Sequence, residues 1–208
     1  MRRRYTLKRR AESRDATRDR IVRAAIELHA QGPASITAIA ARAGVGRVTV
    51  YRHFPEEDSL ILACTSVVFD ERPLPDPDTW AAIDDPAAKM RIALEQLYAY
   101  YADMALLLAS AEANAAAHPA LVGAFAPFDA ALERICESLR AAWPVETSPG
   151  SLMAGVIGHA TAFSTWRSLT TVQGLTPRQA TEVMIRLVAA TATTAPRAQH
   201  GFAEANAE

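Results

Sequence analysis

The stretch "AGVGRVTVYRHF", residues 43–54, decides the fold of this chain because it permits two incompatible interpretations. Polar and apolar residues nearly alternate over 47–54, and the β-branched and aromatic residues there favour a strand. The glycines on either side of Val45 are instead typical of a turn between two helices. An isolated strand would leave its backbone groups unpaired, and no other segment offers a partner. We therefore predict a turn followed by a short helix.

A helix over 47–54 has one apolar inner edge. Val50 and Phe54 are four residues apart, so both face the preceding helices, and the other positions form the surface. The β-branched residues lower helix propensity, but packing commonly decides the conformation of such short segments. Two helices joined by a tight glycine-containing turn form a helix-turn-helix motif.

The segments before and after this stretch complete the predicted head. We expect a basic flexible arm over residues 1–14, followed by a helix-turn-helix domain over 15–54. Within it, Thr37 is the expected cap of the second helix, and Gly44 lies just past the end of that helix. A connecting helix is expected over 55–71, with Pro55 at its start.

The rest of the chain predicts an all-α fold. Four prolines between positions 73 and 86 indicate a linker over 72–85, and helical periodicity then continues over 86–195. Ser148 and Pro149 are expected to start one helix, and "TPRQ" at 176–179 is a capping box that starts another. Residues 196–208 are expected to form a frayed tail.

The charge is divided unevenly along the chain. Residues 1–54 contain 13 Arg or Lys and 4 acidic residues, whereas the remainder contains 9 Arg or Lys and 19 acidic residues. A basic head on an acidic body favours a polyanionic partner for the head alone.

Several other features restrict the class of protein. Cys64 and Cys136 lack the spacing of a metal site and are interpreted as buried core thiols. No apolar stretch follows the charged N-terminus, and the uncharged run over 147–166 has poor hydropathy for lipid. We expect a cytoplasmic protein that uses no membrane, no metal and no cofactor.

The segment "TAIAARAGVGRVTVYRHFPEEDSLI", residues 37–61, resembles the DNA-binding signature of the TetR (tetracycline-repressor-like) transcriptional regulators. The family pattern is Thr-x-x-x-Ile-Ala-x-x-Ala-Gly-Val, then a few variable residues and Tyr-x-x-Phe. The agreeing residues are Thr37, Ala40, Ala43, Gly44, Val45, Thr49, Tyr51, His53 and Phe54. One departure is Glu57, because the family often has a phosphate-anchoring lysine there.

Seven residues are candidates for DNA contact: Thr37, Arg47, Val48, Thr49, Tyr51, Arg52 and His53. The resemblance implies phosphate contacts for Tyr51 and His53. Arg47 could bind a guanine edge, while Val48 and Thr49 could touch thymine methyl groups. Arg52 could reach either a base or the backbone, and Thr37 could bind a phosphate at a helix N-terminus. Each side chain could alternatively have a purely structural role.

The resemblance also implies a homodimer whose helical domain over 86–195 binds a small-molecule effector. The expected dimer face comprises Gly155, Gly158, Ala162, Trp166, Val183, Met184 and Leu187. The candidate effector pocket comprises Phe69, Tyr98, Tyr101, Met104, Phe125, Phe128, His159 and Phe163. The pocket residues suit an apolar or aromatic effector, but a stripe of this kind is more often plain core. The residues of the dimer face could instead pack only within their own chain, although the resemblance favours the dimer.

The resemblance therefore implies a transcriptional repressor that binds a palindromic DNA operator as a homodimer and is released by a small-molecule effector. The first alternative is an architectural DNA-binding protein that responds to no ligand. A helical enzyme is the second, but the sequence contains no phosphate-binding glycine loop, nucleophile elbow or His-x-x-x-His pair.

Overall fold

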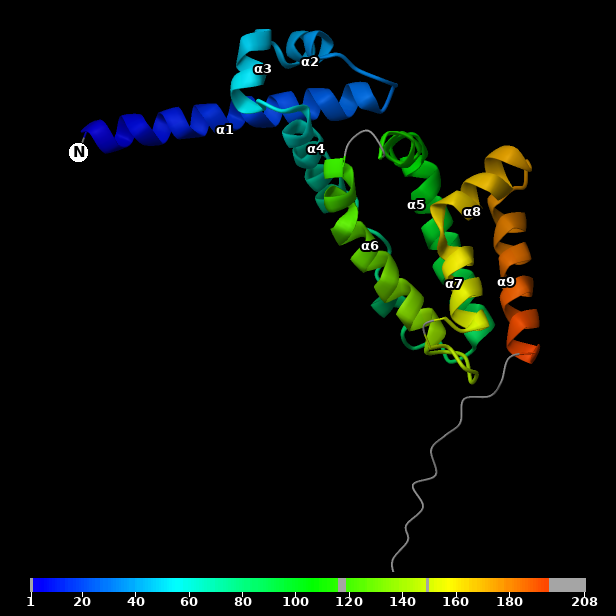
Figure 1. The fold of residues 1–208 in the computed structure, drawn as a ribbon. Coiled ribbons are helices and arrows are strands. Elements are labelled where there is room, and N and C mark those ends of the chain that lie inside the picture. Colours follow the sequence, from blue (N-terminus) through cyan, green and yellow to red (C-terminus); the bar gives the residue numbers. More distant parts are fainter. Residues whose placement is uncertain (1, 116–118, 149, 195–208) are drawn as a thin grey trace, which may run out of the picture. The chain divides into compact units, whose positions relative to one another are not determined.

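The computed structural model describes residues 2–115, 119–148 and 150–194, and every regular element in these ranges is a helix (Figure 1). The elements are α1 (Arg2–His29), α2 (Ile36–Ala43), α3 (Arg47–His53), α4 (Glu57–Glu71), the 3₁₀ helix η1 (Pro77–Trp80), α5 (Pro86–Asn114), α6 (Pro119–Arg140), α7 (Leu152–Thr161), α8 (Phe163–Arg167), the π-helical turn η2 (Ser168–Val172) and α9 (Pro177–Thr194). The all-α prediction is confirmed. The expected tail over 196–208 lies outside the described residues.

The chain packs as two compact units. The head unit consists of Met1–Pro73 and Met104–Phe128, and the body unit consists of Leu74–Asp103 and Asp129–Glu208. Helices α5 and α6 each contribute residues to both units. The two units are defined by packing, whereas the domain limits expected from the sequence are defined by function. Those domain limits remain a prediction.

The core of the head unit is built from one face of each of its first four helices. In Figure 1, α2 and α3 lie along the same side of α1. The core contains Ile21, Val22, Ala24, Ala25, Ile39, Ala40, Ala43, Val50, Phe54, Leu60 and Ala63. Burial of this apolar surface stabilises helices that are too short to be stable in isolation.

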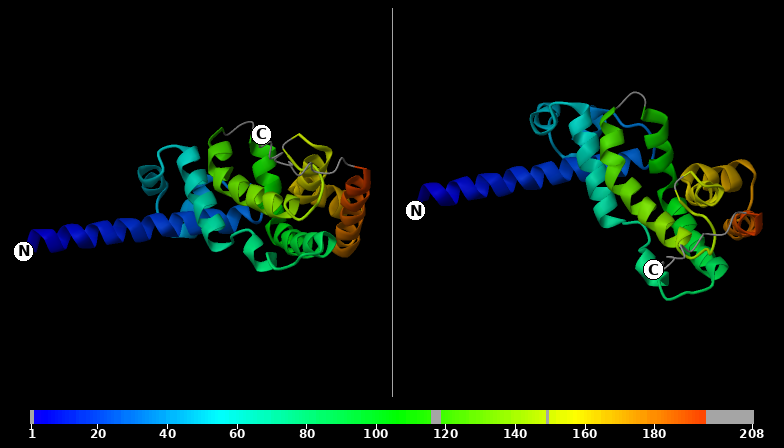
Figure 2. Two further views of the ribbon diagram at one scale, coloured as in Figure 1. Left: turned by 90° about the horizontal axis from the view of Figure 1, so that it is seen from below. Right: turned by 60° about the horizontal axis from the view of Figure 1, so that its bottom comes forward.

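The N-terminal segment differs from the flexible arm that we expected. Helix α1 begins at Arg2 and continues without interruption to His29, so residues 2–14 are helical (Figure 2). The physical reason is that no glycine or proline occurs before Gly32, and Arg, Lys, Ala, Glu and Leu are good helix formers. The helix therefore extends over residues 2–14 even though apolar residues do not recur there at helical spacing.

Three helix starts were predicted at the wrong residue. Ser35, not Thr37, caps α2, because the Ser35 hydroxyl accepts a hydrogen bond from the Ala38 N–H at 3.2 Å. Helix α4 begins at Glu57 rather than at Pro55, and Ser151 rather than Ser148 caps α7. Ser35 and Ser151 have capping side chains close to the expected positions, whereas no side chain caps α4, so the sequence located each helix but not its first residue.

The capping box before α9 is confirmed. The backbone N–H of Gln179 donates to the Thr176 hydroxyl at 3.2 Å, and the Gln179 side-chain oxygen accepts from the backbone N–H of Thr176 at 2.9 Å. These reciprocal hydrogen bonds satisfy two backbone donors at the start of the helix. The expected linker over 72–85 is partly structured, because η1 forms within it and buries Trp80 completely.

The helix expected after residue 148 is broken at Ala162, whose extended backbone (ψ 138°) separates α7 from α8. Carbonyl oxygens just before the break therefore lack helical partners. The Tyr98 hydroxyl donates to the Ala160 carbonyl at 2.8 Å, and the Tyr101 hydroxyl donates to the Thr161 carbonyl at 2.6 Å. These two buried hydrogen bonds connect α5 to the break and give a donor to each carbonyl group that lacks a helical partner.

We expect Tyr101→Phe to lower the free energy of unfolding by about 1–3 kcal/mol, because it leaves the buried Thr161 carbonyl without its donor. Urea unfolding monitored by circular dichroism measures this change. Tyr51→Phe is the matched control, because the Tyr51 side chain is exposed and its hydroxyl makes no hydrogen bond to any described residue. Equal stability of both variants would contradict the assigned role of Tyr101.

Candidate DNA-binding surface

The turn between α2 and α3 depends on Gly44. This glycine has a left-handed backbone (φ 67°), and its N–H reaches the carbonyls of Ala40 and Ala41. The Val45 N–H also donates to the Ala40 carbonyl, at 3.0 Å. Such a left-handed residue ends a helix and reverses the chain within a few residues, and glycine adopts it without steric cost.

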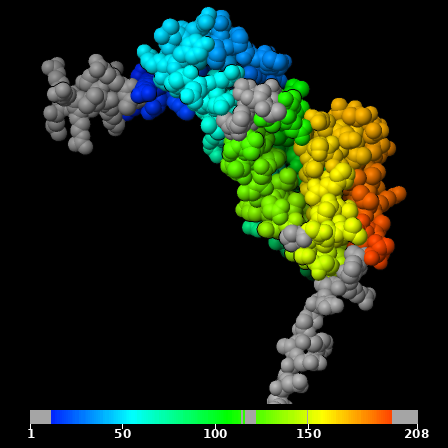
Figure 3. All heavy atoms as spheres, in the orientation of Figure 1, coloured from blue at the N-terminus to red at the C-terminus, as the bar shows by residue number. Residues whose placement is uncertain are grey.

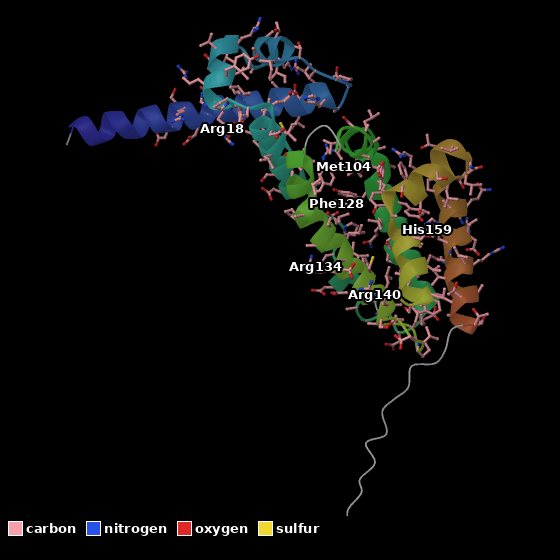
Figure 4. All side chains as sticks on the ribbon, viewed as in Figure 1. Arg18, Met104, Phe128, Arg134, Arg140 and His159 are labelled. Atoms are coloured by element: carbon pink, nitrogen blue, oxygen red, sulfur yellow. The ribbon has the colours of Figure 1, made fainter. Side chains whose placement is uncertain are left out.

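Helix α3 follows directly and presents one edge to the core. The carbonyl of Gly46, the N-cap residue, accepts from the Thr49 N–H at 2.8 Å. Val50 is fully buried and Phe54 is 3% exposed, which confirms the predicted inner edge. The side chain of Arg18 on α1, labelled in Figure 4, covers the Phe54 ring. Its guanidinium carbon lies 5.0 Å from the ring centroid.

The outer face of α3 carries most of the residues predicted to bind DNA. Val48 is 81% exposed and Tyr51 is 49% exposed. Arg47 and Arg52 are also exposed, whereas Thr49 is half-buried. The segment 47–53 lies at the surface of the head unit in the space-filling view (Figure 3). This face therefore combines two exposed arginines with an exposed valine and a tyrosine.

Thr37 and His53 lie at the edges of this face. Thr37 is exposed in the first turn of α2, although Ser35 is the cap. His53, the last residue of α3, is half-buried. Burial is the main cause that lowers its pKa from the ordinary value of 6.5, and the positive charges of Arg52, Arg14 and Arg18 lower it further. Asp15 opposes the shift.

Arg14 and Arg18 are the residues that sequence reasoning missed. Both lie on α1, and their effect on the pKa of His53 shows that their charges act at the end of α3. Their four-residue spacing on a helix was a signal that could have identified them, because such residues share one face. Together with Arg52, they give this end of α3 a positive potential.

The candidate effector residues do not form one group in the structure. Within the head unit, the Phe69 ring lies 5.1 Å from that of Phe125 and 5.2 Å from that of Phe128, measured between centroids. Met104 and Phe128, labelled in Figure 4, are buried in the same unit.

The other four candidates belong to the body unit. Tyr98 and Tyr101 are buried with their hydroxyl groups bound to backbone carbonyls, and the ring of Phe163 lies 5.4 Å from that of Tyr101. His159 is exposed, and its Nδ1 lies 3.1 Å from the Thr165 hydroxyl. Of all eight candidates, only Phe125 lines the cavity described below.

The expected dimer face divides into exposed and buried residues. Helices α7 and α9 pack against each other in the body unit. The break at Ala162 separates Ala162 and Trp166 from α7, the helix that carries Gly155 and Gly158. Trp166 and Met184 are buried within the chain, whereas Val183 and Leu187 on α9 are 43% and 42% exposed.

The two cysteines are free thiols that lie in different units. Cys136 is buried and Cys64 is half-buried, and burial raises the pKa of the Cys64 thiol to about 12. Among the described residues, no group of three His, Cys, Asp or Glu side chains could hold a metal ion. None of the described helices combines the length and apolar character that a membrane span requires.

An exposed helix presented by a glycine turn and flanked by arginines defines the class of a helix-turn-helix DNA-binding protein. Residues 21–64 match the family model described as "Bacterial regulatory proteins, tetR family". The matched segment includes α2, the glycine turn and α3, so this part of the chain is similar to the DNA-binding segment of those regulators. A comparison with curated proteins gives no match.

Three solved structures illustrate the similarity of fold. A TetR regulator from Haloarcula marismortui has 15% identity and a TM-score of 0.58, over 86% of this chain and 97% of its own. A regulator from Rhodococcus sp. Rha1 has 19% identity and a TM-score of 0.52, over 84% of this chain and 96% of its own. RolR, solved with resorcinol, has 22% identity and a TM-score of 0.52, over 88% of this chain and 94% of its own. These similarities show that the fold extends over most of the chain.

The histidine at the end of α3 provides a test of the local electrostatics. We expect His53 to titrate below pH 6.5, so that it is neutral at pH 7 and gains its proton only as the pH falls further. Arg52→Ala should raise its pKa, because a nearby positive charge is removed. NMR titration of the imidazole resonances measures the pKa of His53 in the wild-type chain and in Arg52→Ala. The signal that disappears in His53→Gln identifies the resonance of His53.

Arg47→Ala is the matched control for this titration, because Arg47 is not among the charges that shift the pKa of His53. A His53 pKa at or above the ordinary value, or an equal response to both arginine variants, would contradict the described arrangement.

Proposed function

We propose that this protein is a transcriptional repressor that binds a palindromic operator as a homodimer and is released from DNA by a small-molecule effector. The observation that carries the proposal is the outward face of α3, where Arg47, Val48 and Arg52 are exposed beside Tyr51. A helix of this kind can enter the major groove, which is wide enough to admit it. The site of action is the cytoplasm.

The proposed DNA contacts fall into two groups. Arg47, in the first turn of α3, reads a guanine edge, and Val48 and Thr49 contact thymine methyl groups. Tyr51 and His53 bind phosphates, which position the helix without reading sequence. Thr37 and Arg52 contact the backbone beside the groove, and Arg52 is also within reach of a base.

The proposed dimer uses the outward face of α9. Val183 and Leu187 are four residues apart, so their partly exposed side chains lie on the same face of that helix. A single helix-turn-helix reads one short half-site, and a two-fold dimer reads two. The exposed Gly155 on the adjacent α7 would let a second chain approach closely.

The proposed effector is a small apolar or aromatic molecule bound among the aromatic residues of the helical domain. The rings of Tyr98, Tyr101 and Phe163 offer apolar faces, because both tyrosine hydroxyl groups are already bound to the backbone. Resorcinol, the molecule in the RolR structure, is a ligand of this general kind. Binding would favour one conformation and thereby alter operator affinity.

Arg47→Ala should weaken binding to specific DNA by about 1–3 kcal/mol and non-specific binding by less, because only base contacts discriminate between sequences. Mobility-shift titrations with the protein's own upstream region and with a scrambled duplex measure both affinities. Arg178→Ala is the matched control, since it removes an equal charge from exposed α9 in the body unit.

Equal losses on both duplexes would contradict the role of Arg47 in base readout. Wild-type binding that ignores sequence and simply follows salt concentration would favour the architectural alternative. A specific complex that a cell extract fails to release would contradict the proposed effector response.

Val183→Glu combined with Leu187→Glu should convert the dimer to a monomer, because two buried carboxylates would face each other across the two-fold axis. Sedimentation equilibrium measures the molecular mass directly. Leu106→Glu is the matched control, since Leu106 is 68% exposed on α5, outside the proposed face. Unchanged association of the double variant would contradict the α9 interface.

A further inference from the structure

A cavity of about 280 Å³ lies within the head unit, beside the helix-turn-helix. Its walls come from the end of α1, the following loop, α2, α4 and the head-unit parts of α5 and α6. Its lining includes Ile26, His29, Glu57, Ile61, Ala111 and Phe125. Of the candidate effector residues, Phe125 alone lines this cavity.

Most of this lining is apolar, and two of its polar groups are already bound. The Thr65 hydroxyl donates to the Ile61 carbonyl at 2.9 Å, and the Cys64 thiol lies 3.8 Å from the Val22 carbonyl. An apolar interior with a few polar groups near the opening is the usual composition of a small-molecule site.

Glu57 is the one acidic residue in the lining, and its exposure places it at the mouth of the cavity. The neighbouring imidazole is that of His29. Burial lowers the pKa of His29, although the charge of Glu57 opposes the shift, so the imidazole is neutral at pH 7. The negative charge of Glu57 is therefore not compensated by the histidine beside it, and it would attract a cation and repel an anion.

The volume of the cavity restricts the size of a ligand. Cavities of about 150 Å³ accept benzene, and ligand pockets span about 300–1,000 Å³, so this cavity suits a molecule with one or two rings. The ring of Phe125 and the side chains of Ile26 and Ile61 provide apolar contacts for it.

We propose that this cavity binds a small aromatic amine, with its ring against Phe125 and its ammonium group at Glu57. The cavity wall includes residues of α1 and α2 as well as α4, so a bound amine would favour one arrangement of the helix-turn-helix over others. This site goes beyond the proposed effector site, and it acts directly on the element that presents α3.

Calorimetric titration of the full chain with phenethylamine, without DNA, tests the proposal independently of operator binding. We expect saturable binding of phenethylamine and no binding of phenylacetate, which has a similar ring but the opposite charge. Glu57→Gln should weaken phenethylamine binding about tenfold or more. Glu56→Gln is the matched control, because Glu56 carries the same charge next to Glu57 but does not line the cavity.

A second pair of variants locates the binding site. Ala111→Leu should abolish binding by filling the cavity, whereas Ala113→Leu, on the exposed face of the same helix, should leave it unchanged. Circular dichroism confirms that both variants are folded. Absence of binding by the wild-type chain, equal binding of phenylacetate, or binding that neither Glu57→Gln nor Ala111→Leu weakens would overturn the proposal.

Discussion

The left-handed backbone of Gly44 is the constraint on which the DNA-binding surface depends. A Cβ at this position would meet open space, so the demand for glycine arises from the backbone conformation alone. That conformation costs other residues about 1–2 kcal/mol. Because the turn is tight, only three residues separate the end of α2 from the start of α3, and Val50 and Phe54 then orient α3 on the core.

This orientation explains why the outer face of α3 is available for function. A helix of seven residues with one buried edge leaves its remaining side chains at the surface. The charges of Arg14, Arg18 and Arg52 all act on His53 at the end of that helix. Local placement of arginine, rather than the near-neutral net charge of −1, therefore makes the head suited to a polyanion.

The sequence predicted the helix-turn-helix of the head unit and the start of α9 in the body unit well, because their signals are local. The glycines, the spacing of Val50 and Phe54, and the capping box at Thr176 each depend on a few neighbouring residues. The cap of α2 was assigned to Thr37 instead of Ser35, because both residues have the same capping chemistry.

Long-range packing decided what the sequence could not predict. The carbonyl groups beside the break at Ala162 accept hydrogen bonds from tyrosines that are far away in the sequence. Tyr98 and Ala160, for example, are 62 residues apart. The same contacts occupy the hydroxyl groups of two candidate effector residues. The cavity beside Glu57 also combines distant segments, and no local pattern marks it.

Hydrogen exchange of the full chain with and without its upstream DNA tests the central claim, that residues 43–54 form a turn and a DNA-binding helix. Mass spectrometry resolves the exchange by peptide. The account predicts that DNA slows amide exchange most strongly over 43–54, with little change in peptides of α9. Unchanged exchange over 43–54, in a complex that slows exchange elsewhere, would contradict it.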